Sequence, residues 1–217
     1  MPSALTPTLL LLTSYLIGSL PFAVWVSKLK GIDPRAAGSK NPGATNVTRT
    51  AGLPLGLLTL LLDALKGAAG VLLLSPHGEG WAAAAGWLAV LGHCTSPFLS
   101  FRGGRGVATT GGALLALHLG LGLAATFTWL LALIITRRAA WASLTLSVGV
   151  VILSLQPDVS AAVKLFSAGA GALIAARHWE YLKALLTQRA PSRSTARLTA
   201  RLTPSLTRRP ARRGRKR

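Results

Sequence analysis

The densest group of polar residues in this chain lies between two long apolar segments, at residues 38–49. The stretch reads Gly-Ser-Lys-Asn-Pro-Gly-Ala-Thr-Asn-Val-Thr-Arg. Its glycines let the backbone approach a ligand closely, and its Ser, Thr and Asn side chains offer hydrogen-bonding groups. Lys40 and Arg49 add the positive charge that an anion needs. These residue types predict an anion site, most simply for phosphate, held at a membrane surface.

A second basic, glycine-rich stretch occupies residues 101–109 and contains Gly103, Gly104, Arg105 and Gly106 just before an apolar segment. Backbone N–H groups of such a turn, placed at a helix N-terminus, are a common arrangement for holding phosphate. The alternative is a flexible basic turn among lipid headgroups. No Gly-Lys-Ser/Thr triplet follows at the right spacing, so the stretch is not a Walker A loop.

A third cluster, Arg177 with His178, follows the last apolar segment. A cavity lined by all three clusters would favour small dianions such as phosphate monoesters, and arginine with backbone N–H groups would stabilise developing negative charge. The pattern offers no protein nucleophile, because Cys94 has no motif around it and no Gly-x-Ser-x-Gly elbow occurs. The arginines expected in the cavity, opposed by Asp33 and Glu180, are Arg35, Arg49, Arg102, Arg105 and Arg177.

The elements that must position these clusters are apolar runs almost free of charge, in a chain of mean hydropathy +0.49. Such runs predict membrane helices, here at residues 5–26, 53–74, 81–99, 107–135, 141–155 and 159–176. Gly18 and Pro21 interrupt the first of them. Residues 107–135 have arginine at both ends, and cytoplasmic loops are the basic ones, so this run should form two short helices. We therefore expect an all-α integral membrane protein with seven transmembrane helices, two of them short. Its N-terminus lies outside and its C-terminus in the cytoplasm.

The main structural rival has five spans, with the two short helices re-entrant. Both versions place the polar loops on the cytoplasmic face. We expect a membrane domain at residues 1–188 and a basic, largely disordered cytoplasmic tail at residues 189–217. Such a tail is attracted to anionic headgroups by about 1 kcal/mol per basic residue near the surface. Nucleic acid is not an expected partner, because the tail has no aromatic residues for stacking on bases.

Three residues inside the apolar runs are polar enough to need an explanation. Asp63 and Lys66 lie one helical turn apart, and charges within a membrane are costly and usually paired. We interpret them as a structural pair near the cavity, with direct ligation of substrate as the alternative. His118 is expected to make a helix–helix hydrogen bond.

The sequence resembles the PlsY family, the bacterial integral-membrane acyl-phosphate:glycerol-3-phosphate acyltransferases. The matching residues lie in the right order across the chain to about residue 188: residues 38–49, residues 63–67, Gly92-His93 through Phe98, residues 101–109 and Arg177-His178. The resemblance implies seven spans in the bacterial inner membrane, with the active site facing the cytoplasm. It implies acyl transfer from acyl phosphate to the 1-hydroxyl of glycerol 3-phosphate, giving lysophosphatidic acid and phosphate. It also implies no cofactor, no metal and no acyl-CoA, so that the partners are the two substrates and membrane lipids.

Carried over residue by residue, the resemblance makes His178, Arg105 and Arg49 the catalytic candidates. The substrate-binding candidates are Ser39, Asn41, Gly43, Thr45, Asn46, Arg49, Gly103, Gly104, Arg105, Gly106, Ser143, Arg177 and His178, with Ser143 resting on a looser match. Arg105 stands in place of the family's usual lysine, which exchanges a compact ammonium for a planar fork. Tyr181 stands in place of its usual asparagine.

Two questions stay open at this level. The proton of the attacking hydroxyl can pass to the donor's own phosphate, whose second pKa is about 6, or to His178 as general base. The alternative function is a small-anion membrane transporter, since glycine-broken helices and basic loops also suit alternating access. The chain shows no internal repeat and gathers its polarity on one side, which favours the enzyme.

Overall fold

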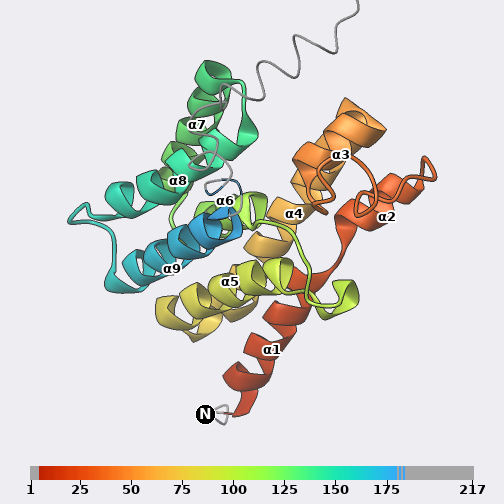
Figure 1. Ribbon diagram of the computed structural model, residues 1–217. Helices are drawn as coiled ribbons and strands as arrows, with labels where there is room; N and C mark the ends of the chain where they lie inside the picture. Colours follow the sequence, from red (N-terminus) through yellow and green to blue (C-terminus); the bar gives the residue numbers. More distant parts are fainter. Residues whose placement is uncertain (1–4, 180, 182, 184–217) are drawn as a thin grey trace, which may run out of the picture. The chain divides into compact units, whose positions relative to one another are not determined.

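The computed structural model describes residues 5–179, 181 and 183, which fall into two units, Met1–Trp179 and Glu180–Arg217. The predicted domain boundary at residue 188 and the basic tail lie outside the described residues. Within the described residues, the regular elements of the first unit are all helices (Figure 1). Its α-helices are α1 (Leu5–Ser19), α2 (Phe22–Lys28), α3 (Ala44–Ala51), α4 (Leu53–Leu74), α5 (Glu79–Cys94), α6 (Val107–Leu117), α7 (Leu119–Thr136), α8 (Ala139–Ser154) and α9 (Ala161–Arg177), with single 3-10 turns η1 (Ser75–His77) and η2 (Pro97–Leu99).

Several helices are long and apolar enough to cross a membrane. Among the described residues, four segments meet this condition: Pro7–Lys28, Leu53–His77, Glu79–Leu99 and Leu119–Thr136. Val107–Leu117 and Ala139–Ser154 are apolar but shorter. The prediction of an all-helical membrane protein is confirmed, whereas the count of seven crossings and the orientation of the termini stay predictions.

The first predicted span is broken where its sequence indicates. α1 ends at Ser19 and α2 begins at Phe22, with Pro21 between them at φ −88° and ψ 57°. Proline has no N–H to donate and fixes its own φ, so it cannot continue the hydrogen-bond ladder of α1. The break leaves the carbonyl groups at the end of α1 in need of other donors.

The long apolar run at residues 107–135 also divides into two helices, as predicted. The break falls at His118, which has extended backbone angles, and not at the glycines. α7 has 18 residues, so only α6, with 11, is short. The His118 Nδ1 atom accepts a hydrogen bond from the Leu121 N–H at 3.2 Å and so caps α7. The expected helix–helix hydrogen bond of His118 is therefore corrected to a helix cap.

α3 lies within the polar connection and was not predicted. Val47 and Ala51, four residues apart on one face of α3, pack with Ala23 of α2 in a small separate core. A helix of eight residues with only two small apolar residues on its buried face has too short a pattern to be predicted from the sequence. α3 packs against α4, with Thr48 lying against Gly56, while Thr45 and Arg49 are exposed.

α4 has the reverse of the polarity found in a soluble helix. Its outward leucines, Leu57, Leu61 and Leu65, are each more than half exposed and suit contact with lipid. Its inward face carries small and polar residues: Gly56, Thr59, Asp63, Lys66, Gly67 and Gly70. Small residues let membrane helices pack closely, and inward charges avoid the hydrocarbon.

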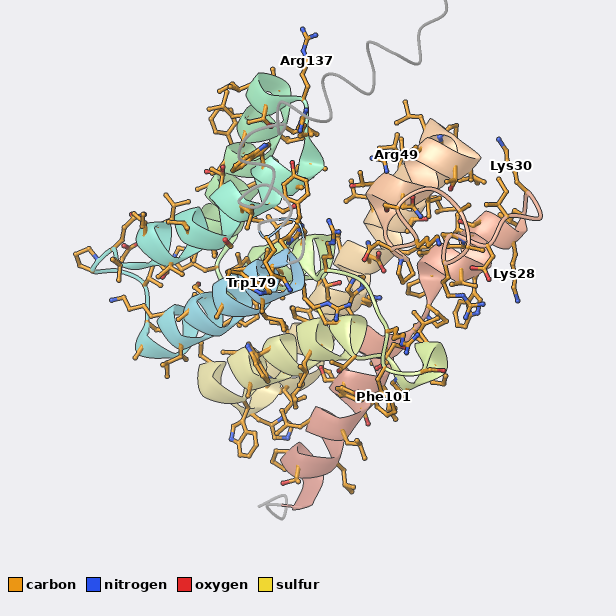
Figure 2. The ribbon with its side chains drawn as sticks, viewed as in Figure 1. Lys28, Lys30, Arg49, Phe101, Arg137 and Trp179 are labelled. Atoms are coloured by element: carbon orange, nitrogen blue, oxygen red, sulfur yellow. The ribbon has the colours of Figure 1, made fainter. Side chains whose placement is uncertain are left out.

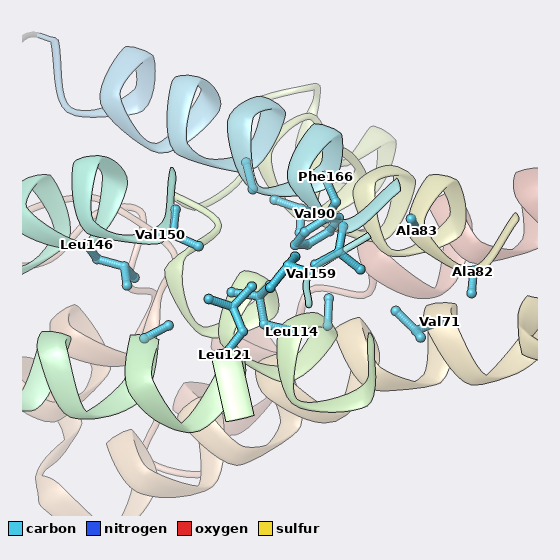
Figure 3. Packing of buried hydrophobic residues seen from close by; sticks show 14 of the residues in the cluster. Val71, Ala82, Ala83, Val90, Leu114, Leu121, Leu146, Val150, Val159 and Phe166 are labelled. Atoms are coloured by element: carbon cyan, nitrogen blue, oxygen red, sulfur yellow. The ribbon is translucent and has the colours of Figure 1, made fainter. Parts of the chain in front are cut away.

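α4 and α6 meet at glycines on both sides. A Cβ atom at Gly67 would clash with the carbonyl of Thr109, and one at Gly112 would clash with the carbonyl of Ala64. The main apolar core then continues from α4 to α9, with Val90, Leu114, Leu121, Val150 and Phe166 at its centre (Figure 3). This packing fixes the helix ends from which the basic loops emerge.

Candidate active site

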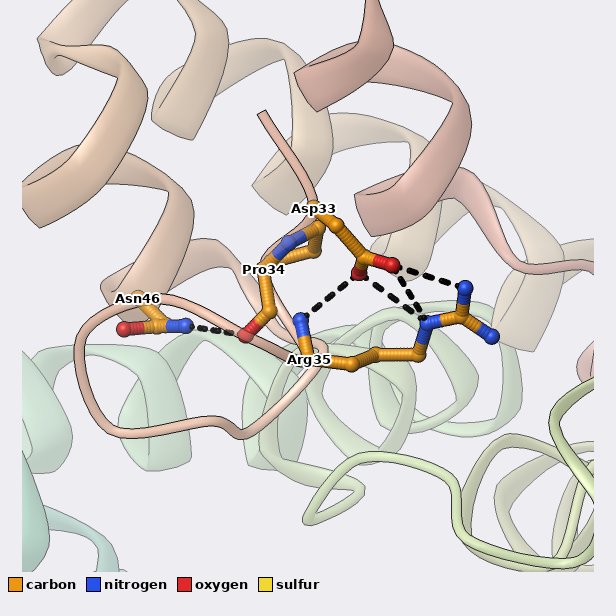
Figure 4. Close-up of polar contacts among 4 residues, drawn as sticks. All are labelled: Asp33, Pro34, Arg35 and Asn46. Atoms are coloured by element: carbon orange, nitrogen blue, oxygen red, sulfur yellow. Dashed lines mark hydrogen bonds and ion pairs between the residues drawn. The ribbon is translucent and has the colours of Figure 1, made fainter. Parts of the chain in front are cut away.

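The loop between α2 and α3 is held by its own charged pair. Arg35 donates from Nη2 and Nε to the Asp33 carboxylate at 2.8 and 3.0 Å, and the Arg35 N–H donates to it at 2.9 Å (Figure 4). These hydrogen bonds lower the pKa of Asp33 to about 2. Arg35 is therefore partly neutralised by Asp33, and it contributes less to an anion site than its sequence position suggests.

Asn46 is buried and fastens this loop to α3. Its Nδ2 donates to the carbonyl of Pro34 at 2.8 Å (Figure 4) and to that of Ala37 at 3.0 Å. Its Oδ1 accepts the Ser39 N–H at 2.8 Å. Gly38, at φ +61°, leaves no room for a side chain beside Asn46 Oδ1. The amide predicted to contact substrate is thus engaged by the loop backbone, which makes Asn46 a residue that shapes the site.

The other predicted residues of this stretch lie on its surface. Ser39, Thr45 and Arg49 are exposed, and Asn41 and Gly43 are half-buried. Arg49 projects from α3, and Lys28 and Lys30 stand at the end of the neighbouring α2 (Figure 2). The result is a basic edge on which hydroxyl and amide groups remain accessible.

The glycine loop before α6 is bound to two helix ends. The N–H groups of Gly103 and Gly104 donate to the carbonyls of Cys94 and His93, at the end of α5, at 3.1 and 3.0 Å. Their carbonyls accept from Arg177 Nη2 at 2.7 Å and Nε at 3.1 Å, respectively. The expectation that these two N–H groups face a ligand is therefore corrected, because the carbonyls of α5 occupy them. The guanidinium of Arg177 is likewise hydrogen-bonded to this loop, which indicates a structural role for Arg177.

The candidate anion-binding groups of this loop lie at the start of α6. Gly106, in the left-handed conformation at φ 81°, is the N-cap residue of α6, and as a glycine it has no side chain with which to cap this helix. The first N–H groups of a helix have no partner within it, and they carry the positive end of the helix dipole. The amides of residues 107–109, together with the half-buried Arg105, are therefore the candidate phosphate ligands.

His178 follows α9 directly and is 2% exposed. Its Nδ1 lies 2.8 Å from the carbonyl oxygen of Ile174. Since a carbonyl can only accept, the proton sits on Nδ1, and Nε2 is left as an acceptor. Burial lowers the pKa of His178, and the nearby positive charges of Arg105 and Arg177 lower it further, although the hydrogen bond to Ile174 raises it. The ring is thus a neutral acceptor near Arg105.

Ser143 lies on α8, near the C-terminal end of α9 that His178 follows. A side chain at Gly171 would meet the carbonyl of Ser147, so the antiparallel register places Ser143 one turn nearer to Arg177. The Ser143 hydroxyl donates a hydrogen bond to the carbonyl oxygen of Ala139 at 2.8 Å and accepts one from Trp129 Nε1 at 3.3 Å. It therefore joins α7 and α8, and it lies deeper than the exposed hydroxyls of the first stretch.

The two loops meet at a small pocket. Its lining includes Pro42 from the first stretch, Gly104 from the second, and the side chains of Asp63, Lys66 and His93. Sequence reasoning paired Asp63 with Lys66, because they are one turn apart, but it did not bring His93 to them. His93 comes from α5, and only the packing of α5 on α4 makes this contact.

These helices and loops define a helical integral membrane protein with a candidate site for phosphorylated ligands. The sequence model of the family described as Glycerol-3-phosphate acyltransferase matches residues 8–188. The chain belongs to this family, the PlsY-type acyltransferases of phospholipid synthesis.

Individual relatives agree over nearly their whole length. The Glycerol-3-phosphate acyltransferase of Synechococcus sp. is 41% identical over 88% of this chain and 95% of its own. Glycerol-3-phosphate acyltransferase 1 of Deinococcus radiodurans is 42% identical over 83% of this chain and 92% of its own. The predictions of the family and of an acyltransferase are confirmed.

Two solved structures share the fold. The crystal structure of PlsY (YgiH) in its glycerol 3-phosphate form superposes with a TM-score of 0.79 at 34% identity, covering 89% of this chain and 98% of that one. The lysophosphatidic acid form of the same protein gives 0.78 at 34% identity, covering 86% and 94%. Both are described as an integral membrane glycerol 3-phosphate acyltransferase, so the membrane location is confirmed for this fold.

Proposed function

We propose that this chain transfers an acyl group from acyl phosphate to the 1-hydroxyl of glycerol 3-phosphate. The hydroxyl oxygen attacks the acyl carbonyl carbon, the bond from that carbon to the phosphate oxygen breaks, and phosphate leaves. The hydroxyl proton goes to a nearby base, and the products are 1-acyl-glycerol 3-phosphate and inorganic phosphate. The observation that carries the proposal is the placing of Arg105 and the uncapped N-terminus of α6 near a buried, neutral His178.

Each of the two substrates carries a phosphate, and the chain offers two basic groups. One is Arg105 with the amides at the start of α6. The other is Arg49 with Ser39, Asn41, Gly43 and Thr45 around the start of α3. Asn46, Gly103, Gly104, Arg177 and Ser143 support these groups by holding loops and helices in place. Acyl phosphate is already activated, so positioning and charge stabilisation supply most of what the reaction needs.

We propose the leaving phosphate of the donor as the proton acceptor, because its second pKa of about 6 suits proton transfer near neutrality. His178 is the competing base, and its Nε2 has the free lone pair that the role requires. In the first case His178 orients the hydroxyl by accepting its hydrogen bond without taking the proton.

We further propose seven crossings in a bacterial inner membrane, with both substrate-binding loops and the C-terminus on the cytoplasmic side. The basic loops support this orientation, since lysine and arginine collect on the cytoplasmic side of such proteins. The basic residues 189–217 would then bind anionic headgroups.

One assay tests the reaction. Purified protein in detergent, given acyl phosphate and glycerol 3-phosphate, should release phosphate and lysophosphatidic acid in equal amounts. Replacing acyl phosphate by acyl-CoA should give neither product from the same preparation. Product from acyl-CoA alone would reassign the donor. No product from either donor, with phosphate uptake into sealed vesicles, would establish the transporter instead.

A further inference from the structure

An ion pair that is not among the phosphate ligands proposed above lies inside the helix bundle. Lys66 Nζ lies 2.8 Å from Asp63 Oδ1, and both side chains are 3% exposed. Lys66 Nζ also donates to the carbonyl of Leu20 at 3.1 Å and lies 5.8 Å from the centre of the Phe22 ring. The Leu20 carbonyl also accepts the Phe22 N–H at 3.0 Å, so the ammonium adds a second hydrogen bond at the proline break between α1 and α2. A buried ion pair is costly to desolvate and is weak evidence for stability alone.

The same pair reaches the glycine loop through His93. His93 Nδ1 lies 3.6 Å from Asp63 Oδ1, and the His93 carbonyl accepts the N–H of Gly104. The imidazole packs so closely on Gly104 that a Cβ atom there would clash with His93 Nε2. Asp63 thus bears on the position of the loop that leads into α6.

The pocket formed by this cluster is about large enough for one water molecule. Leu20 and Pro21 of the helix break, Pro42 of the first stretch and Gly104 of the second all border it. The cluster therefore borders both the first and the second basic stretch, whose relative position matters if each holds one phosphorylated substrate.

We propose that Asp63, Lys66 and His93 are positioning residues for the acyl transfer. Lys66 holds the break after α1, and Asp63, through His93, holds the glycine loop and hence the start of α6. This inference rests on the proposed function. The side chains act through the backbone they hold.

Kinetics of the purified protein test the proposal. Lys66→Met and Asp63→Asn should each lower kcat by roughly 10²-fold, because small misplacements of a catalytic group have effects of that size. The double variant Asp63→Asn/Lys66→Met removes both charges, so it should regain thermal stability. Its kcat should stay low, because the contact with Leu20 is still missing. Wild-type kcat in the double variant would overturn the proposal.

A matched control comes from another buried hydrogen bond between helices. Ser14 of α1 donates to the carbonyl of Ala85 in α5 at 2.8 Å, and it is fully buried. Ser14→Ala should lower thermal stability but keep kcat within about twofold of wild type. An equal loss of kcat in Ser14→Ala would reduce the role of the cluster to general stability.

Cys94 provides a readout that does not depend on activity. It is the only cysteine of the chain, it is buried, and its carbonyl accepts the N–H of Gly103. N-ethylmaleimide should label it about tenfold faster or more in Lys66→Met, since a buried group reacts through local opening, and no faster in Ser14→Ala. Unchanged labelling in Lys66→Met would overturn the loop-holding role. Faster labelling in a protein whose wild type makes no product would uphold that role and overturn only the proposed reaction.

Discussion

The Nη2 atom of Arg177 donates a hydrogen bond to the carbonyl oxygen of Gly103 at 2.7 Å. The two residues are 74 positions apart in the sequence, and their contact joins the end of α9 to the loop before α6. The planar guanidinium also reaches Gly104 through Nε, so one side chain fixes two successive peptide groups. The position of the α6 N-terminus depends on this clamp.

We expect Arg177→Lys to lower kcat/KM by roughly 10-fold to 100-fold, because a hydrogen bond from a charged donor contributes about 1.5–3 kcal/mol. Lysine keeps the charge but cannot contact both carbonyls with a fixed fork. The control is Arg137→Met, an exposed arginine in the turn between α7 and α8 (Figure 2). Steady-state kinetics in detergent decide the matter. Full activity in Arg177→Lys would show that activity requires only the positive charge at this position and not the two hydrogen bonds to Gly103 and Gly104.

Asn46→Asp should be as damaging as Asn46→Ala, although aspartate nearly preserves the shape of the side chain. A carboxylate can still accept the Ser39 N–H, but it cannot donate to the Pro34 and Ala37 carbonyls, and it places charge against them. Each lost hydrogen bond contributes about 1 kcal/mol, so activity should fall roughly 10-fold or more. Measured kcat/KM equal to wild type in Asn46→Asp would contradict the loop-holding role.

The neighbouring glycines Gly111 and Gly112 of α6 should respond in opposite ways to alanine. A Cβ atom at Gly111 meets open space, whereas one at Gly112 clashes with the Ala64 carbonyl of α4. Gly111→Ala should raise stability by up to about 1 kcal/mol through helix propensity. Gly112→Ala should lower it by about 1–3 kcal/mol through overpacking. Thermal unfolding in detergent measures both, and similar shifts in the two variants would disprove the close contact of α4 with α6.

His178 should make stability depend on pH in the acid range. Burial, together with the charges of Arg105 and Arg177, lowers its pKa in the folded protein. At pH values below the ordinary histidine pKa of about 6.5, the His178 imidazole is therefore protonated in the unfolded chain but still neutral in the folded protein. Stability falls as pH drops from that value toward the lowered pKa. Tm measured across this range should decline less in His178→Ala than in wild type, and equal declines would contradict the lowered pKa.

The same variant separates the two candidate bases. If the donor phosphate accepts the proton, His178→Ala lowers kcat but retains the acid limb of the pH–rate profile, because that limb belongs to the substrate. This is the result we expect. Loss of the limb in His178→Ala would instead make the histidine the base. Profiles recorded with saturating acyl phosphate provide the comparison.

The sequence by itself determined the membrane character, the broken first span, the division of residues 107–135 and the three basic clusters. Apolar runs, proline and arginine act locally, so their consequences can be read without knowing what lies opposite. Pro21 breaks its helix whatever packs there.

Only the tertiary structure decided which N–H groups and side chains of these clusters are available to a ligand and which are bound within the protein. The N–H groups of Gly103 and Gly104 are available to a ligand or not according to where the end of α5 lies. The imidazole of His93 meets Asp63 only because α5 packs against α4. α3 forms because a small core covers Val47 and Ala51. Hydrogen-bond partners far apart in sequence are set by helix packing, which no local pattern of residues specifies.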